Sequence, residues 1–238
     1  MRIVTFVIPL KEWEIEKLEL LFSSLQIIAA SIKIDVIIVY SGLSPKEHTD
    51  RINNSAIRMS LIYSEPKGIY NAYNLGSSLA TSKWIMFLGG DDFVFPSLLH
   101  ILKNLERLSS YDAIVCQVVF GTKSILKPIR FKQGLIFRNW CHQGVIYKKA
   151  LFNSFKYDEK YPIQADHKFN IEISKECKIK FSNLVISYFD TEGVSQTNTD
   201  WAFYRDMPKI VQGSFGYFWS VISIIRKLPG KIKRIVLK

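Results

Sequence analysis

Apolar residues follow two different spacings along the first 120 positions of the chain. Short continuous apolar runs, such as "RIVTFVIP" and "IDVIIVYSG", are typical of strands that are buried in a sheet. Between these runs, apolar residues recur three or four positions apart, as an amphipathic helix requires. The predicted strands cover residues 2–9, 34–42, 58–65, 83–90 and 111–121, and the predicted helices cover residues 11–31, 68–82 and 96–110.

The alternation of strands and helices predicts the fold class. It is typical of an α/β domain in which a mainly parallel sheet carries helices on both faces. Ligands of such sheets bind outside the carboxyl ends of the strands. After residue 120 the pattern is mixed: residues 131–152 combine loop, strand and short helix, residues 161–176 are predicted to be helical after Pro162, and residues 177–190 resemble a strand.

Two adjacent aspartates, Asp91 and Asp92, follow two glycines at the end of the predicted strand 83–90. Neighbouring carboxylates repel each other, and their burial is costly. A divalent cation such as Mn²⁺ or Mg²⁺ would offset this cost, because it binds carboxylate oxygens and shares its other positions with substrate phosphates. The same four residues also suit a turn, with Asp92 capping the helix that begins near Pro96.

Positive charge is concentrated at the C-terminal end. The chain of 238 residues carries a net charge of +11. An apolar stretch, residues 215–225, precedes most of the terminal cations, and this combination suits the interface of an anionic bilayer. The alternative is a terminal helix packed on the domain with a solvated basic end. Residues 207–238 contain no acidic side chain, and their basic residues are Lys209, Arg226, Lys227, Lys231, Lys233, Arg234 and Lys238.

Cysteine usage and hydropathy argue against several classes of protein. Cys116, Cys141 and Cys177 form no CxxC pair, which disfavours a zinc site or a disulfide framework and favours a reducing compartment. The N-terminal apolar stretch is too short for a signal peptide, and no stretch approaches the roughly 20 apolar residues of a membrane span. No RNA-recognition, zinc-finger or helix-turn-helix pattern accompanies the positive charge, so no nucleic-acid partner is predicted.

Ordered segments of the chain resemble family 2 glycosyltransferases. They are "TFVIPLKEW", "SEPKGIYNAYNLGSSLATSKWIMFLGGDD", "CHQGVIYKKALF" and "QADHKFNIEI", and they extend over residues 2–190 in the order in which the family carries them. The resemblance implies a GT-A fold, a nucleotide-sugar donor, a divalent metal (Mn²⁺ or Mg²⁺) and an inverting displacement.

The resemblance also implies roles for the residues that match its acidic motif and its acceptor-side segments. Asp91 would bind the metal and the donor diphosphate, and Asp92 would shape the site. Asp166 matches the general base, which takes the proton of the acceptor hydroxyl; its alternative role is to cap the helix that follows. His142 and Gln143 would face the donor diphosphate or the acceptor, where a charged histidine could stabilise the leaving group. Their alternative is a polar loop packed against Trp140.

The remaining donor-binding positions are assigned by the same resemblance. Gly89 stands where relatives carry an acidic or amide side chain, so one ribose or metal contact would be absent or made through water. Ser41 is a candidate for contacting the base, because the usual aspartate after this strand is absent. The other residues expected to contact the donor are Pro9, Leu10, Lys67, Gly68, Tyr70, Asn71 and Asn74.

The resemblance, taken with the basic tail, implies a metal-dependent inverting glycosyltransferase of bacterial surface-polysaccharide biosynthesis. It would transfer a hexose or N-acetylhexosamine from a UDP-sugar to a polyprenyl-diphosphate-linked saccharide, in the cytoplasm at the inner face of the membrane. The expected domains are a GT-A domain (1–200, with a donor half 1–120 and an acceptor half 121–200) and a basic helical tail (201–238). A nucleotidyltransferase using the acidic pair, or a non-catalytic protein that binds polyanions, are the alternatives.

Overall fold

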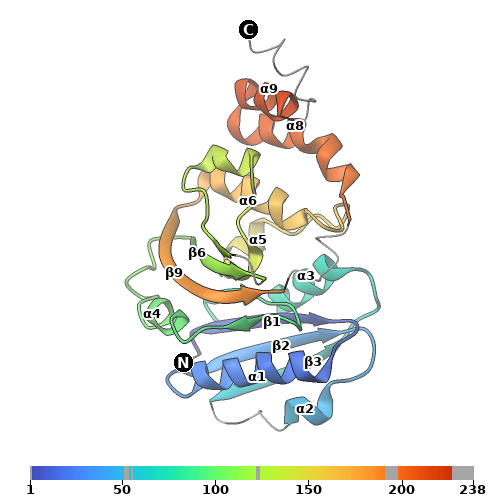
Figure 1. Cartoon of the computed structure of the whole chain (residues 1–238), viewed down its shortest axis with the longest axis vertical. Coiled ribbons are helices and arrows are strands. Elements are labelled where there is room, and N and C mark those ends of the chain that lie inside the picture. Colours follow the sequence, from blue (N-terminus) through green and yellow to red (C-terminus); the bar gives the residue numbers. More distant parts are fainter. Residues whose placement is uncertain (1, 51–53, 55, 122–123, 191–197, 227–238) are drawn as a thin grey trace.

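The computed structural model describes residues 2–50, 54, 56–121, 124–190 and 198–226 as a layered α/β molecule (Figure 1). The strands are β1 (Val4–Leu10), β2 (Ile34–Tyr40), β3 (Ile57–Tyr63), β4 (Trp84–Phe87), β5 (Phe93–Val94), β6 (Ala113–Phe120), β7 (Ser124–Leu126), β8 (Val145–Lys148) and β9 (Ile179–Phe189). The helices are α1 (Ile15–Ala29), α2 (Lys46–Asp50), α3 (Ile69–Leu79), α4 (Leu98–Leu102), α5 (Leu151–Ser154), α6 (Ala165–Glu176), α8 (Trp201–Phe215) and α9 (Tyr217–Ile225), with 3-10 turns η1 (Lys132–Ile136) and η2 (His142–Gly144).

The strands form one sheet in the order β3-β2-β1-β4-β8-β6-β9-β5, with β7 paired to β6. Strands β3, β2, β1 and β4 run parallel, and so do β6 and β9. Strand β8 joins these two groups and is antiparallel to both. The predicted α/β class with a mainly parallel sheet is therefore confirmed. Because β1 and β4 are parallel neighbours, the loops that follow them emerge at the same edge of the sheet.

Helices cover both faces of the sheet because successive side chains of a strand point in opposite directions. Phe6 of β1 belongs to the core that includes Leu21 of α1, whereas Val7 belongs to the core that includes Tyr73 of α3. Helix α3 lies so close to β1 that a Cβ on Gly76 would come within 2.3 Å of Val7 Cγ1. Glycine at this position therefore lets the helix pack directly on the strand.

The helix predicted over residues 96–110 is shorter in the structure, where α4 ends at Leu102. Beyond this point the backbone continues in turns, and several N–H groups bond the carbonyl three residues earlier, as between Asn104 and Ile101 at 2.9 Å. The Asn104 side chain donates to the His100 carbonyl at 2.8 Å, and such local bonds compete with regular helix geometry. Buried Leu105 keeps this segment against the core even though it is not α-helical.

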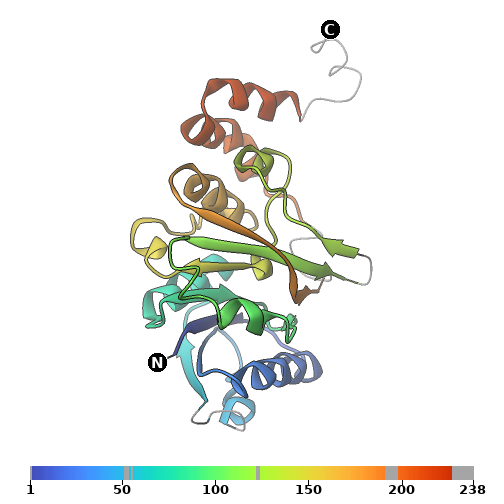
Figure 2. The ribbon, with the colours of Figure 1, turned by 90° about the vertical axis from the view of Figure 1, so that its left-hand side faces the viewer.

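Helices α8 and α9 lie at the end of the molecule farthest from β1–β3 (Figure 2). Phe203, Met207 and Val211 of α8 are buried in the same core as Phe169 of α6. The Ser220 hydroxyl of α9 donates to the Pro208 carbonyl at 2.8 Å and ties the two helices together. Among the described residues, no helix combines the length and hydropathy needed to cross a bilayer.

The helical character expected of the C-terminal segment thus holds as far as Ile225, and α8 is packed on the domain rather than separate from it. The division at residue 200 remains a prediction. Most of the terminal cations lie outside the described residues, namely Lys227, Lys231, Lys233, Arg234 and Lys238.

Candidate functional site

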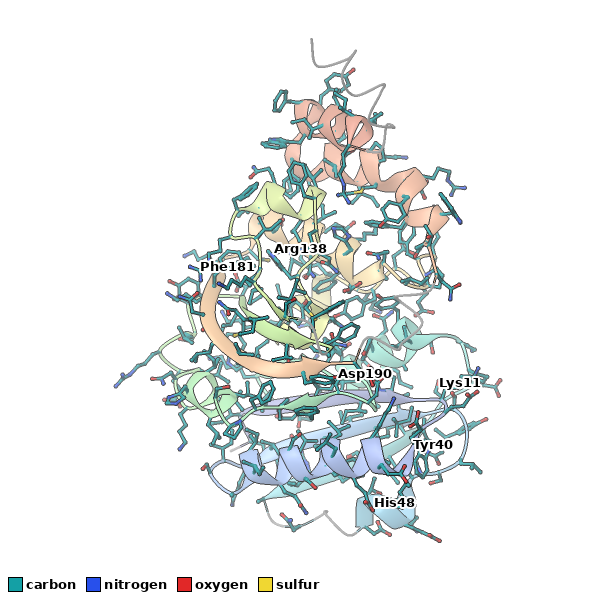
Figure 3. The ribbon with its side chains drawn as sticks, in the orientation of Figure 1. Lys11, Tyr40, His48, Arg138, Phe181 and Asp190 are labelled. Atoms are coloured by element: carbon teal, nitrogen blue, oxygen red, sulfur yellow. The ribbon has the colours of Figure 1, made fainter. Side chains whose placement is uncertain are left out.

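A cavity of about 970 Å³ opens at the carboxyl ends of β1 and β4 and extends to α6 and the C-terminal helices. Labelled side chains in Figure 3 mark its extent: Asp190 lies at the end of β9, and Arg138 lies nearer to α8 and α9. The structure brings most of the predicted catalytic and binding residues into this one cavity. Those that line it are Pro9, Leu10, Tyr70, Asp91, Asp92, His142, Gln143 and Asp166.

The other predicted donor contacts are not among the residues that line this cavity, and their role in donor binding stays a prediction: Ser41, Lys67, Gly68, Asn71 and Asn74. Asn74 holds α3 to the loop before α6, because it donates to the Tyr157 carbonyl and accepts from the Tyr157 N–H. Asn71 and Asn74 both donate to the Glu159 carboxylate at 3.0 Å. Gly68 has a φ of 102°, so its place before α3 requires glycine for backbone reasons.

The acidic loop after β4 is both a turn and an acidic site. The Asp92 N–H bonds the Gly89 carbonyl across the turn, and its carboxylate accepts from the Gly89 N–H at 2.6 Å. A Cβ on Gly89 would lie 2.6 Å from Asp91 Oδ1 and 3.0 Å from Asp92 Oδ2. A side chain at position 89 would therefore require the two following carboxylates to move.

Asp92 is a buried structural residue of this loop rather than the cap of α4. Besides Gly89, its carboxylate accepts from the Asp190 N–H at 3.3 Å, and Gln143 hydrogen-bonds it as well. Burial and the charge of Asp91 raise the pKa of Asp92 to about 7, against the lowering effect of these donors. The cap interpretation is wrong, because α4 begins after Ser97 with no side-chain cap.

Sequence reasoning missed Asp190, which lies at the end of β9 and faces the same part of the cavity as Asp91. Burial raises the pKa of Asp91, and the negative charge of Asp190 adds to that effect. Lys17 of α1 forms an ion pair with Asp190 at 3.1 Å. The positive charge of Lys17 lowers the pKa of Asp91 and so opposes the effects of burial and of Asp190. Asp190 is 99 residues away from Asp91 in the sequence and belongs to no recognised motif, so the sequence alone gives no sign that the two are close.

Two side chains hold the Asp166 carboxylate in place. The Tyr70 hydroxyl lies 2.7 Å from Asp166 Oδ1, and Asn139 Nδ2 donates to Asp166 Oδ2 at 2.7 Å. The Asn139 amide is itself oriented, because its Oδ1 accepts from Asn170 Nδ2 at 2.9 Å and Asn170 Oδ1 accepts from the Tyr147 hydroxyl at 2.8 Å. This chain of donors fixes which atom of Asn139 faces the carboxylate.

Asp166 lies in the first turn of α6, whose cap residue is Gln164, so the proposal that it is only the helix cap is wrong. Burial raises the pKa of Asp166 to about 6, and the hydrogen bonds from Tyr70, the His167 N–H and Asn139 act to lower it. A carboxylate with a pKa just below neutral is ionised at pH 7 and still able to accept a proton, as a general base requires.

The histidines near the site are neutral. His142 is stacked on Phe87 with ring centroids 4.9 Å apart, and its Nε2 lies 2.7 Å from the Tyr157 hydroxyl. Burial lowers its pKa to about 3, so the charged imidazole expected beside the leaving group is not supported. Burial also lowers the pKa of His167 to about 4, and its Nε2 lies 2.6 Å from the Leu135 carbonyl. Asp166 is therefore the better proton acceptor at neutral pH.

Comparison with known proteins agrees with this geometry. Residues 15–169 match the family model described as "Glycosyl transferase family 2". The chain belongs to glycosyl transferase family 2. It is a glycosyltransferase, so the nucleotidyltransferase and polyanion-binding alternatives are not supported.

Similar family 2 members include "PGL/p-HBAD biosynthesis glycosyltransferase" of Mycobacterium bovis (strain BCG / Pasteur 1173P2) and of Mycobacterium tuberculosis (strain ATCC 25177 / H37Ra). Each is 28% identical over 216 residues, covering 83% of this chain and 81% of the relative. Among solved structures, S. aureus TarS 1-349 in complex with UDP covers 98% of this chain and 68% of its own, with a TM-score of 0.67 and 14% identity. The same protein in complex with UDP-GlcNAc matches with a TM-score of 0.67 and 13% identity, over 98% of this chain and 69% of its own. The predicted GT-A fold is thereby confirmed.

Proposed function

We propose that this family 2 glycosyltransferase transfers a hexose or N-acetylhexosamine from a UDP-sugar, with inversion, to a polyprenyl-diphosphate-linked saccharide of a bacterial surface polysaccharide. The observation that carries the proposal is one cavity that joins the acidic loop of β4 to a positioned carboxylate, Asp166. The UDP and UDP-GlcNAc complexes of TarS support the donor class, and the names of the PGL/p-HBAD biosynthesis relatives support a role in a biosynthetic glycosyl transfer.

Asp166 has the environment of a general base. The side chains of Tyr70 and Asn139 hold one carboxylate oxygen each, and with the His167 N–H they leave lone pairs to accept the hydrogen of an acceptor hydroxyl. As the hydroxyl oxygen bonds to the anomeric carbon, its proton passes to Asp166. The bond from that carbon to the nucleoside diphosphate breaks on the opposite face, and its electron pair leaves with the diphosphate.

Tyr70 can adjust to the protonation of Asp166. Its single hydroxyl hydrogen has two acceptors at 2.7 Å, Asp166 Oδ1 and the Ile163 carbonyl. It donates to Asp166 when the carboxylate is ionised. Once Asp166 carries the proton, the Tyr70 hydroxyl can donate to Ile163 and accept from Asp166, so both charge states keep their hydrogen bonds.

The acidic end of the cavity fits a divalent cation that is shared with the donor. Within the described residues, no cluster of three or more His, Cys, Asp or Glu side chains forms a complete metal site. Mg²⁺ and similar ions, however, are commonly held by one or two carboxylates together with substrate phosphates. Asp91 and Asp190 are the residues that would hold it, and the bound ion would neutralise charge on the departing diphosphate.

A thermal-shift screen of nucleotide sugars tests the donor class. We expect UDP-hexoses or UDP-N-acetylhexosamines to raise Tm in the presence of Mn²⁺ and to have a much smaller effect in EDTA, because ligand binding to the native state stabilises it by mass action. GDP- and dTDP-sugars serve as the matched controls. A larger shift with one of these controls, or an equal shift in EDTA, would contradict the proposed donor or the proposed metal.

The C-terminal helices fit contact with an anionic membrane surface. Tyr217, Phe218 and Ile224 of α9 are exposed by 74%, 68% and 47%, at the end of the chain where basic residues are concentrated. Aromatic and aliphatic side chains beside Lys and Arg bind the interface of anionic bilayers. A peripheral position on the cytoplasmic leaflet would bring the cavity to a lipid-linked acceptor.

Replacing Tyr217 and Phe218 together with serine is expected to weaken sedimentation with phosphatidylglycerol vesicles at least severalfold, because each exposed ring contributes buried apolar area at the interface. The fold should be retained, since neither ring is part of the core. Serine at Leu20 and Ile27, two half-exposed positions of α1, is the matched control. Deletion of residues 214–238 should abolish binding, and undiminished binding by that deletion would refute the membrane role.

A further inference from the structure

The side chain of Arg226, the first residue after α9, lines the catalytic cavity instead of extending with the terminal cations. Its Nη1 atom is buried and has no hydrogen-bond partner among the residues that the structure describes. The other such atom is the small neutral hydroxyl of Thr5. This placement differs from the sequence-based view of Arg226 as one of several solvated basic residues.

The position of Arg226 suits an anionic ligand, because Nη1 is buried although the residue as a whole is only half-buried. A buried charged donor without a partner costs more than a typical hydrogen bond contributes, and arginine remains protonated under these conditions. No carboxylate of the described residues forms an ion pair with Arg226. Its charge acts on two neutral groups instead: it contributes to the lowered pKa of His167, and it lies near Tyr204. The cavity therefore presents a cation that has no carboxylate partner among the described residues.

The guanidinium lies on the acceptor side of the general base. The charge of Arg226 contributes to the lowered pKa of His167, and His167 follows Asp166 directly in α6. Helix α9 packs against η1, and Arg138 lies shortly after η1, directly before the Asn139 that orients Asp166. The acidic residues that face the donor are at the other end, where Figure 3 places Asp190 well apart from Arg138.

We infer that Arg226 binds a phosphate group of the acceptor, with Arg138 as a second cation on the same side of the cavity. Planar guanidinium groups bind phosphate oxygens through paired N–H donors, which suits this ligand. The inference deepens the proposed function and rests on it for the lipid-linked character of the acceptor. Exposed Tyr217 and Phe218 lie in α9, the helix that Arg226 directly follows. A lipid at the surface of α9 could therefore place its phosphates at Arg226 and its saccharide toward Asp166.

Isothermal titration of the full chain with farnesyl diphosphate tests the inference, with saturating UDP and MgCl₂ present to fill the donor site. We expect Arg226→Met to weaken binding at least tenfold and Arg226→Lys to weaken it less. Arg205→Met on α8 is the matched control, because Arg205 is exposed, pairs with Asp206 and lies outside the cavity. Inorganic pyrophosphate distinguishes the sources: binding of both probes through Arg226 assigns a general phosphate site, and binding of farnesyl diphosphate alone assigns a lipid phosphate.

Equal affinity of wild type and Arg226→Met for both probes overturns the inference. So does weaker binding of UDP itself in Arg226→Met, because Arg226 would then belong to the donor site. These outcomes are separate from the proposed function. Sugar transfer with unchanged farnesyl diphosphate affinity refutes the phosphate subsite alone, whereas Arg226-dependent binding without transfer to any lipid-linked saccharide refutes the proposed function and leaves the subsite standing.

Discussion

Asp166→Asn is expected to lower the rate of sugar transfer by about 10² to 10⁴-fold while leaving UDP-sugar affinity unchanged. This is the range that a positioned general base contributes. Asparagine keeps the size of the side chain and can still accept a hydrogen bond from Tyr70 or Asn139, but it cannot take the proton of the acceptor hydroxyl. Initial rates with radiolabelled donor and titration of UDP-sugar measure the two effects separately.

The control is Glu176→Gln, the same change of acid to amide at an exposed position near the end of α6 and outside the cavity. A loss of activity through unfolding can also be recognised. The folded-state pKa of Asp166, about 6, is above its unfolded value, so ionisation of this group opposes folding above pH 6 and that penalty fades as the pH falls toward 4. Asp166→Asn should therefore melt no lower than wild type at pH 8. Transfer at the wild-type rate by this variant would rule out Asp166 as the base.

The pH dependence of wild-type transfer should report the ionisation of Asp166. We expect kcat/KM to fall about tenfold per pH unit below a pKa of about 6, because only ionised Asp166 accepts the proton. The Tyr70 hydrogen bond lowers this pKa, so Tyr70→Phe should move the acidic limb to higher pH. An acidic limb that does not move in Tyr70→Phe would mean that another group controls it.

Much of the fold could be predicted because the buried strands are continuous apolar runs. The residues of β1 and β2 are almost all buried, so their continuous apolar sequences predict both the strands and the parallel sheet. The short strands β5 and β7 were not predicted, because two or three residues are too few to show the alternation of apolar and polar positions that indicates a strand. The end of α4 was also missed, because it depends on local bonds such as that from Asn104 to His100 rather than on the apolar spacing.

The candidate site was predictable where its chemistry is concentrated in a short motif. Asp91 and Asp166 stand in recognisable segments, and the structure places both in one cavity. Asn139, Asp190 and Arg226 line the cavity only because the fold brings distant parts of the chain together, and a single sequence contains no sign of that arrangement. Asn74 also matches a motif position, and the structure adds a contact that the motif does not indicate, because its side chain holds the backbone of Tyr157.

Asp91→Ala is expected to weaken metal-dependent UDP binding at least about 30-fold and to abolish transfer at ordinary donor concentrations. Removing one partner of a desolvated charge pair costs about 2–5 kcal/mol, and 2 kcal/mol corresponds to about 30-fold in affinity. Burial and the charge of Asp190 raise the pKa of Asp91, so its carboxylate is in an environment that a cation would stabilise. Titration of UDP with and without Mn²⁺ measures the effect.

The sign of the effect should reverse in EDTA, and this reversal separates a metal ligand from a residue that merely shapes the loop. Without a cation, the negative charges of Asp91 and Asp190 repel the diphosphate, so Asp91→Ala should bind UDP as tightly as wild type or more tightly. A residue that only maintained the turn would lose affinity in both conditions. Asp50→Ala, at an exposed aspartate of α2 outside the cavity, should match wild type throughout. If Mn²⁺ strengthened UDP binding equally in Asp91→Ala and wild type, Asp91 would not be the residue that holds the cation, and Asp190 would be the carboxylate to test next.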